Sequence, residues 1–538
     1  MLNQTQKHSQ ILENMRMNLV FVIQLFIVFL VATGTIERWW IIPLAVLVSL
    51  YALLANLPSA TLYFIRAVPI FVAIPLTAYF DNFNLWRIFS GLVFLRWFFD
   101  YRAELIDKLR SALAQPKAIF KRYPLLVCFA GFILISILSL IGADLFIGLK
   151  RLIFILNLSL IAPVIFTLIR DQKLSLPLVF KNIIYAGVIV MAVGVIQLIS
   201  AYLVDFWTFI EYWARMVQYG FYGFEWSGIA YTSNTWFAYL SDQLSLRVFS
   251  TLPDSHSFPV VLLFVLPALF AMAAYPVLQK LGSNLTLKRL YLTRGNLLMA
   301  LIPLVYILLI LSGTRGIWLA SLAPLVIAPF ALRFLKSHDN KNIFKYLISF
   351  WLLFFMLFTV AWPIFSSNQF QIAKSEGDEL FKKRIRSILD LGETSNLGRI
   401  LIWKETVRSI GQNPLFGVGI GNFPVILGQG QDTSRAGSSA HNLYLHIAAE
   451  TGLLGLIFAL GALLLVLWGG WVVFRDSSDY RAKLYGLAWF LYFLWILAYL
   501  MTDAVLFDER AFLMFVINAS IIWALKKGQH RRRANLLI

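Results

Sequence analysis

Residues 438–455 read Ser-Ser-Ala-His-Asn-Leu-Tyr-Leu-His-Ile-Ala-Ala-Glu-Thr-Gly-Leu-Leu-Gly and lead into an apolar run that extends to about residue 474. An apolar run of roughly 17 to 25 residues is long enough to cross a bilayer as a helix. The stretch therefore predicts a membrane-spanning helix that follows a long polar segment. His441 stands at this junction, and an imidazole can take up or release a proton near neutral pH.

The composition of the whole chain agrees with a membrane protein. The chain has 538 residues, of which 60% are hydrophobic and only 14% are charged, and its mean hydropathy is +0.76. A soluble protein of this length could not bury so much apolar surface. The net charge of +19 comes mainly from short segments between apolar runs, a placement that orients membrane proteins. We therefore predict no nucleic-acid partner.

Apolar runs that can span a bilayer recur along the chain, and with a weaker run at 84–98 they predict an all-α polytopic membrane protein of about 12–14 transmembrane helices. The weaker run could instead be a half-helix. The stronger runs lie near 17–34, 39–56, 61–80, 124–142, 151–169, 182–204, 257–279, 296–313, 316–333, 346–365, 446–474, 484–503 and 509–526.

Lys and Arg residues predict the orientation. If the run at 84–98 crosses the membrane, the cationic segment 99–123, the later short basic loops and the C-terminal cluster all fall on one side. Cytoplasmic loops are enriched in Lys and Arg, so both termini are predicted to be cytoplasmic. The segment 205–256, the turn 313–316 and the loop 366–440 then lie outside the cytoplasmic membrane.

The predicted organisation has five parts. The outer segment 205–256 is rich in Trp, Tyr and Phe, which favour the membrane interface. Two amphipathic helices are expected in the long loop, at 379–390 and 399–410, before a turn with Pro414 and several glycines. The parts are an N-terminal transmembrane bundle (1–204), the aromatic interfacial segment (205–256), central transmembrane helices (257–365), an extracytoplasmic loop domain (366–440), and C-terminal helices with a basic cytoplasmic tail (441–538).

Two arginines on the predicted outer side are candidate phosphate ligands. Arg315 lies in a tight Gly-Thr-Arg-Gly turn between two apolar runs, and Arg247 precedes Asp254 and His256 at the start of another run. A guanidinium stays charged and can hold phosphate oxygens with two parallel hydrogen bonds. The alternative is that Arg315 anchors a helix end in the lipid headgroups. Capping of the helix start alone explains Asp254 and Ser257.

His441 is the candidate catalytic base. An isolated histidine at a helix start is more often a satisfied polar residue, but two arginines on the same side favour catalysis. The chain has no Asp-x-Asp pair and no Cys/His cluster, and a divalent cation on a sugar diphosphate usually needs carboxylate ligands. The sequence therefore predicts no metal, no cofactor and a metal-independent reaction.

Through these residues and their neighbours, the chain resembles the O-antigen ligase family and the related membrane polysaccharide polymerases and protein O-glycosyltransferases. The similarity is strongest over about 245–475. The segments that carry it are Leu246-Arg247 to Asp254-Ser255, Ser312-Gly-Thr-Arg-Gly316, Gly398-Arg399 to Pro414-Leu-Phe-Gly-Val-Gly419, and His441-Asn442 to Gly455.

The resemblance implies a multi-spanning glycosyltransferase with a periplasmic cap in the bacterial cytoplasmic (inner) membrane. Such an enzyme moves a glycan from an undecaprenyl-diphosphate carrier to an acceptor hydroxyl and inverts the anomeric centre. His441 matches the family's proposed general base, and Arg315 and Arg247 match arginines thought to hold the diphosphate. Thr314 replaces the usual serine, and His256 stands where asparagine is more common. The predicted substrate-binding residues are Arg399, His256, Asn442 and Tyr444.

The acceptor remains open at this stage. A ligase would use lipid A–core or another glycan, whereas an O-antigen or exopolysaccharide polymerase would use a second lipid-linked repeat; membrane lipids surround both. A lipid-linked oligosaccharide flippase or transporter is a remoter alternative. It is disfavoured because the sequence has no detectable repeated halves and because the candidate residues cluster at the outer face rather than the midplane.

Overall fold

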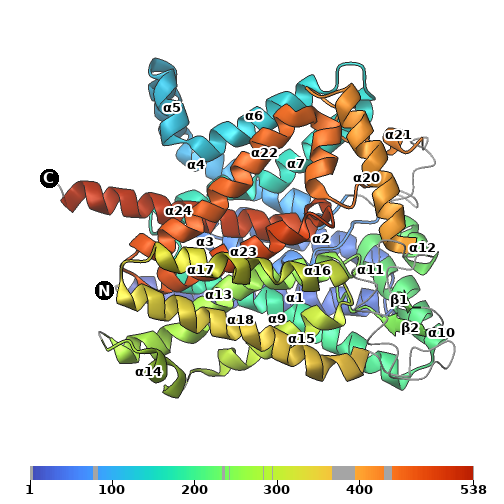
Figure 1. Ribbon diagram of the computed structural model, residues 1–538, viewed down its shortest axis with the longest axis horizontal. Coiled ribbons are helices and arrows are strands. Elements are labelled where there is room, and N and C mark those ends of the chain that lie inside the picture. The colour runs from blue at the N-terminus through green and yellow to red at the C-terminus, as the bar shows by residue number, and fades with distance from the viewer. Residues whose placement is uncertain are drawn as a thin grey trace.

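The computed structural model describes residues 4–76, 83–232, 237–240, 243–282, 284–293, 295–365, 394–428 and 439–536. Over these ranges the chain forms a bundle of helices packed side by side (Figure 1). The exception is one antiparallel β-hairpin, in which Phe237 pairs with Leu246. Both chain ends lie at one end of the bundle, and the hairpin lies at the other (Figure 1). The hairpin was not predicted, but the all-α class holds.

The elements of the first half of the chain precede Arg247. They are α1 (Gln4–Ala32), α2 (Ile41–Leu54), α3 (Leu57–Ala67), α4 (Leu85–Ala114), α5 (Pro116–Arg122), α6 (Pro124–Leu138), α7 (Leu145–Ser159), α8 (Ile161–Arg170), α9 (Leu176–Leu203), α10 (Phe206–Ile210), a π-helical stretch (Glu211–Val217), α11 (Gln218–Tyr222), α12 (Phe224–Thr232), β1 (Phe237–Leu240) and β2 (Gln243–Leu246).

The second half of the chain contains the most buried helices, α13 and α23, which pack against each other at the centre of the bundle. The helices are α13 (Ser257–Leu281), α14 (Leu287–Leu292), α15 (Leu301–Leu311), α16 (Arg315–Ala320), α17 (Ala323–Arg333), α18 (His338–Phe365), α20 (Thr394–Gln412), α21 (Phe423–Ile426), α22 (Leu443–Asp476), α23 (Tyr480–Tyr499) and α24 (Glu509–Leu536).

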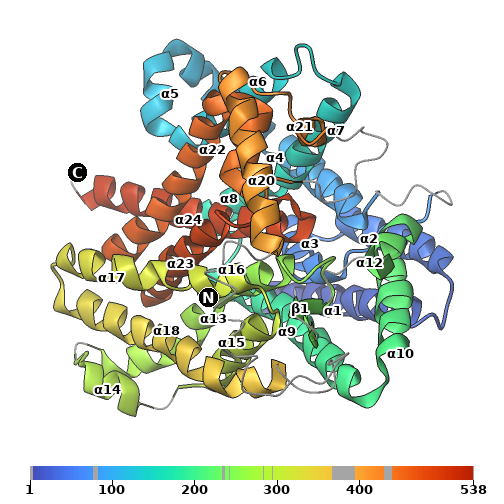
Figure 2. The same cartoon turned by 45° about the vertical axis from the view of Figure 1, so that its right-hand side comes forward.

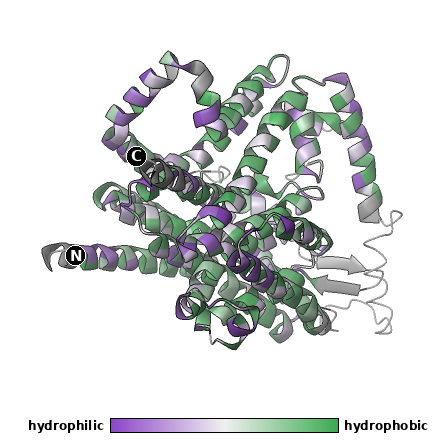
Figure 3. Cartoon of the chain, turned by 60° about the vertical axis from the view of Figure 1, so that its left-hand side comes forward, coloured by the Kyte–Doolittle hydropathy of each residue, from purple (hydrophilic) through white to green (hydrophobic). Residues whose placement is uncertain are grey.

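The described residues confirm a multi-pass, all-α membrane protein. Nine helical runs among them are long and apolar enough to span a bilayer, and three shorter apolar helices accompany them. Hydrophobic residues make up much of these helices (Figure 3), and many of their large hydrophobic side chains are exposed. The nine runs are Gln10–Ala32, Leu145–Arg170, Leu176–Leu203, Ser257–Leu281, Arg315–Arg333, His338–Ala361, Leu443–Asp476, Tyr480–Tyr499 and Glu509–Gly528.

The predicted run at 61–80 is not one continuous helix. Helix α3 ends at Ala67, a 3₁₀ turn follows to Ile70, and the chain then continues in extended form to Leu76. Pro69 and Pro75 lack a backbone N–H and disfavour a continuing helix. Instead, Ala73 N donates to Phe221 O (2.9 Å), and this contact joins the extended chain to α11.

The weaker run at 84–98 is helical from Leu85 onward and belongs to α4. Leu85 N bonds Val72 O at the start of this helix, and Tyr101 bonds Asp171 beyond the end of α8. Helix α4 therefore runs along the bundle rather than turning back as a half-helix, while its crossing of the membrane stays a prediction. In the long loop, the predicted helix 399–410 is confirmed as part of α20, whereas 379–390 lies outside the described residues.

Helix α22 is broken at Gly452, which has φ 69° and ψ −179°. The turn that contains Pro414 packs into this break. Val418 N donates to Ala449 O (2.9 Å), Gly419 N to Glu450 O (2.9 Å), and Leu453 N to Pro414 O (2.8 Å). A Cβ atom at position 452 would collide with the backbone of Leu415. Glycine is therefore required here for both its conformation and its small size.

We expect Gly452→Ala to destabilise the fold strongly, because it combines a left-handed backbone, which costs on the order of 1–3 kcal/mol, with a backbone collision. The measurement is the thermal midpoint of the purified protein, detected from the fraction that stays monodisperse after heating. Gly411→Ala in α20 is the control, because nothing lies within 4 Å of the added Cβ and alanine favours a helix. Equal midpoints for the two variants would contradict the account of the break.

Candidate active site

The guanidinium of Arg247 joins three segments at the hairpin end of the bundle. Arg247 follows β2, and its Nε donates to Ser312 O (3.3 Å). Its Nη2 donates to Thr314 Oγ1 (3.0 Å) and lies 3.2 Å from His256 Nε2. Burial lowers the pKa of Arg247 to about 10, so the side chain still carries its charge at pH 7.

His256 faces Arg247 as a neutral imidazole. Burial is the first cause that lowers its pKa well below the ordinary value, and the charges of Arg247 and Arg399 add to it. Because Arg247 can only donate, His256 Nε2 accepts and the ring proton resides on Nδ1. Asp254 Oδ1 lies 4.0 Å from Nδ1, and Asp503 Oδ2 lies 3.8 Å from Nε2. Asp254 also caps α13 through the backbone N–H groups of His256 and Ser257 (2.8 and 2.7 Å).

Arg315 is the first residue of α16 and is half-buried. The turn before it depends on Gly313, which has φ 64°, and on Thr314, whose hydroxyl donates to Ser255 O (3.0 Å). Thr314, the residue before Arg315, also accepts a hydrogen bond from Arg247 Nη2 (3.0 Å). This turn therefore presents Arg315 beside the segment that carries Arg247 and His256.

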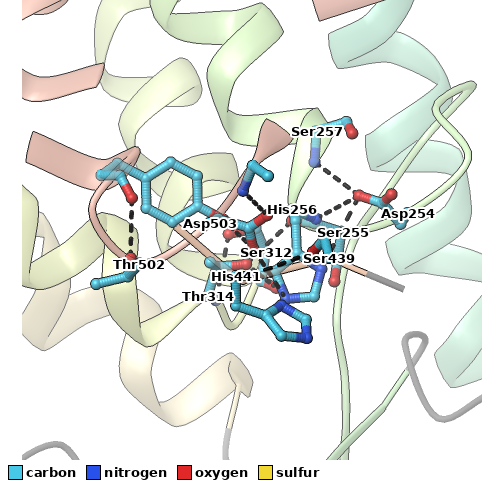
Figure 4. Close-up of polar contacts among 12 residues, drawn as sticks. Asp254, Ser255, His256, Ser257, Ser312, Thr314, Ser439, His441, Thr502 and Asp503 are labelled. Carbon is cyan, nitrogen blue, oxygen red and sulfur yellow. Dashed lines mark hydrogen bonds and ion pairs between the residues drawn. The ribbon is translucent and has the colours of Figure 1, made fainter. Parts of the chain in front are cut away.

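His441 enters the same site from the start of α22 (Figure 4). Its backbone is left-handed (φ 46°), and its N–H donates to Ser439 Oγ (3.2 Å). A non-glycine residue in this conformation is uncommon and persists when its surroundings fix it. Burial and then the charge of Arg399 lower the pKa of His441 to about 4, so the imidazole is neutral at pH 7 and its free nitrogen can accept a proton.

Two further contacts hold the chain just before His441. Ala440 N donates to His446 Nδ1 (3.3 Å), and Trp403 Nε1 in α20 donates to Ala440 O (2.7 Å). His446 Nε2 lies 3.2 Å from Glu450 Oε1, and both side chains are buried. Glu450 thus fixes the His446 tautomer whose Nδ1 accepts from Ala440. The turn at the break of α22 and helix α20 therefore both position His441.

Asn442 and Tyr444, which the sequence predicted to bind substrate, make structural contacts. The Asn442 side chain caps α22 by accepting from Tyr444 N and Leu445 N (3.0 Å each). The Tyr444 hydroxyl donates to Leu497 O in α23 (2.8 Å). Their contact with substrate stays a prediction.

Arg399 is half-buried on α20, which packs against α22 (Figure 2). Its charge acts on the pKa of His441, His256 and Asp503, so it lies near all three. The structure therefore brings Arg247, His256, Arg315, Arg399 and His441 together from segments far apart in the sequence.

The carboxylate of Asp503 was missed by the sequence analysis. It follows α23, accepts from Ala504 N (2.7 Å) and the Tyr499 hydroxyl (3.3 Å), and burial followed by the charge of Asp254 raises its pKa to about 6. Its position at the C-terminal end of the run 484–503, which is the predicted outer end, was the available signal. Among the described residues, no group of three His, Cys, Asp or Glu side chains is placed to hold a metal ion, and metal independence stays a prediction.

One comparison with known proteins gives a match that overlaps this site. Residues 298–460 match the family model described as O-antigen ligase, a range that includes Arg315, Arg399 and His441 but not Arg247 or His256. No curated protein matches the chain. The matched range also contains the turn at Pro414 and the break at Gly452 that position His441. On this match, residues 298–460 form a region similar to the O-antigen ligase family, which supports a glycan-transfer function in general.

Proposed function

We propose that this protein transfers a glycan from an undecaprenyl-diphosphate carrier to an acceptor hydroxyl at the outer face of the cytoplasmic membrane. The observation that carries the proposal is the convergence of three arginines with a neutral imidazole, Arg247, Arg315, Arg399 and His441. Positive charge held in a partly buried site suits an anionic diphosphate, and a neutral histidine suits removal of a proton.

In the proposed reaction, the acceptor hydroxyl attacks the anomeric carbon of the donor from the face opposite the carrier. The bond between the anomeric carbon and the diphosphate oxygen breaks, and its electron pair leaves with the diphosphate. The hydroxyl proton passes to His441. Attack from the opposite face inverts the anomeric centre. The arginines stabilise the departing anion, so the chemistry proposed here needs no divalent cation.

Donor binding and the basicity of His441 are coupled in this proposal. The charge of Arg399 helps to lower the pKa of His441 to about 4, which makes the empty site a weak base. A bound diphosphate places negative charge beside the same guanidinium and offsets this effect. His441 therefore becomes a stronger base when the donor is present. In this proposal the diphosphate raises the pKa of His441 before the acceptor binds.

The acceptor distinguishes the two forms of the proposal. A ligase would transfer to lipid A–core or another glycan, whereas a polymerase would transfer to a second lipid-linked repeat. Incubation of the purified protein with a defined lipid-diphosphate oligosaccharide, followed by mass analysis, separates them: a product with two repeats on one carrier indicates a polymerase. Product formed in detergent also excludes a pure flippase, which would need a sealed membrane.

We expect His441→Ala to lower the transfer rate by about 100-fold or more, because general base catalysis typically contributes 10²–10⁴-fold, while donor binding is retained. Product formation with a lipid-linked oligosaccharide and a suitable acceptor is the measurement. His338→Ala is the matched control, since His338 is exposed at the start of α18. A wild-type rate in His441→Ala would eliminate His441 as the base.

Arg315→Lys tests the geometry of phosphate binding. Lysine keeps the charge but cannot make two parallel hydrogen bonds, so we expect at least about a tenfold loss of kcat/KM for the donor. Arg289→Lys, at an exposed position of α14, should leave kcat/KM unchanged. If both variants behave alike, Arg315 does not contact the diphosphate.

The pH dependence of donor binding tests Asp503. With a pKa of about 6, Asp503 is mainly a carboxylate at pH 7.5 and mainly a neutral acid at pH 5.5. The site thus becomes more positive as pH falls, and we expect the KM for the anionic donor to decrease. His441, with a pKa of about 4, stays neutral over this range. In Asp503→Asn the KM should not change with pH, and a KM that still falls would assign the titration to another group.

A further inference from the structure

A polar cavity lies at the opposite end of the bundle from the candidate active site. It has a volume of about 470 Å³, opens to the outside and is lined by residues of α1, α3 and α9. Asn182 of α9 lines it, whereas Gln197 of the same helix accepts from Phe249 N (2.9 Å) just beyond Arg247. Fifteen residues of helix separate these positions, which is roughly 22 Å at about 1.5 Å per residue. The cavity is therefore separate from the site proposed for glycan transfer.

Arg66 forms the inner end of this cavity. Its Nε donates to Asn182 Oδ1 and its Nη1 to Asn18 Oδ1, at 2.7 Å each. The guanidinium lies over the rings of Phe21 and Tyr185, 5.1 and 4.8 Å from their centroids. The residue is buried, and among the described residues no carboxylate lies within ion-pair distance of it. A buried charge ordinarily needs an opposite charge or a full set of hydrogen bonds.

Lys181 supplies a second cation at the mouth. It is exposed on α9, one residue from Asn182, and its ammonium lies 5.5 Å from the Tyr185 ring. Asn14 of α1 also lines the cavity. Apart from the Tyr185 hydroxyl, the polar groups that line the cavity are thus two cations and three amides, and no carboxylate lines it. This combination selects an anion that accepts several hydrogen bonds.

The remaining lining is apolar. Tyr185 and Val188 are each 38% exposed on the outward face of α9, within a helix long and apolar enough to span the membrane. The other apolar lining residues are Met17, Phe21, Leu62, Leu178 and Ile189. A soluble anion makes no favourable contact with this apolar surface, whereas a lipid whose phosphate lies at the cations can place an acyl chain against it by van der Waals packing.

We propose that this cavity binds the headgroup of an anionic phospholipid, with the phosphate at Arg66 and Lys181 and an acyl chain along Tyr185 and Val188. Basic pockets between transmembrane helices are sites of this kind. The lipid would connect α1 to α9 in the leaflet on the side of the chain termini. This site is independent of the glycan-transfer site and of the function proposed for it.

The test uses the full-length protein in neutral detergent and the variant Lys181→Glu. Lys280→Glu is the matched control, because it makes the same change in net charge as Lys181→Glu. Lys280 is exposed at the end of α13 and does not line the cavity. Dioleoylphosphatidylglycerol, dioleoylphosphatidylcholine and inorganic phosphate are titrated separately. Native mass spectrometry counts the retained lipids, and the thermal midpoint reports their effect on stability.

We expect wild type and Lys280→Glu to retain phosphatidylglycerol and to melt at a higher temperature with it, and Lys181→Glu to bind it about tenfold more weakly. Equal binding by the two variants would overturn the proposal. So would equal stabilisation by phosphatidylcholine, or protection by inorganic phosphate alone, which would indicate an ion site. Should Lys181→Glu fail to fold, Lys181→Gln replaces it, with Lys280→Gln as control and the same criteria.

Discussion

The hydrogen bonds of Arg247 are the contacts on which the candidate site depends. The Arg247 guanidinium donates to Ser312 O and Thr314 Oγ1 and faces His256. The Thr314 hydroxyl in turn donates to Ser255 O. The segment after the β-hairpin, the start of α13 and the turn before α16 are thereby held together. An arginine can do this because its planar group offers several donors in a fixed geometry. A lysine also has three donors, but they lie on a single nitrogen and do not have the planar spread of the guanidinium.

The other half of the site comes from the break in α22. Gly452 lets the turn at Pro414 dock against the helix, and Glu450 and His446 within the same region fix the chain before His441. Helix α20 carries Arg399 and also anchors Ala440 through Trp403. The range that matches the O-antigen ligase model thus contains Arg315, Arg399 and His441 together with the backbone turn and helix break that position His441. Arg247 and His256 come from the preceding part of the chain.

The sequence predicted the class of the fold because long apolar runs leave the backbone few alternatives to helices in a membrane. The prediction was wrong for the run at 61–80, in which Pro69 and Pro75 disfavour a continuous helix. The hairpin before Arg247 was not predicted. The break at Gly452 could not be predicted, because a glycine within an apolar helix is common and only its contact with Leu415 shows why it is needed.

The candidate site was predictable only in part. Positive charges between apolar runs predicted a common side for Arg247, Arg315 and His441, which are far apart in the sequence. Their proximity required the packing of α13, α16 and α22 around α23. Asp503 was overlooked because a single acidic residue at a helix end has many ordinary explanations, and its relation to His256 arises from tertiary contacts alone.

The central claim is that Arg247 and Arg315 bind one diphosphate together. The most direct measurement is the affinity of undecaprenyl diphosphate, compared with undecaprenyl monophosphate, for the wild-type protein and for Arg247→Gln and Arg315→Gln. The account predicts that the wild type prefers the diphosphate and that each single substitution removes most of this preference. An unchanged preference in either variant would contradict it.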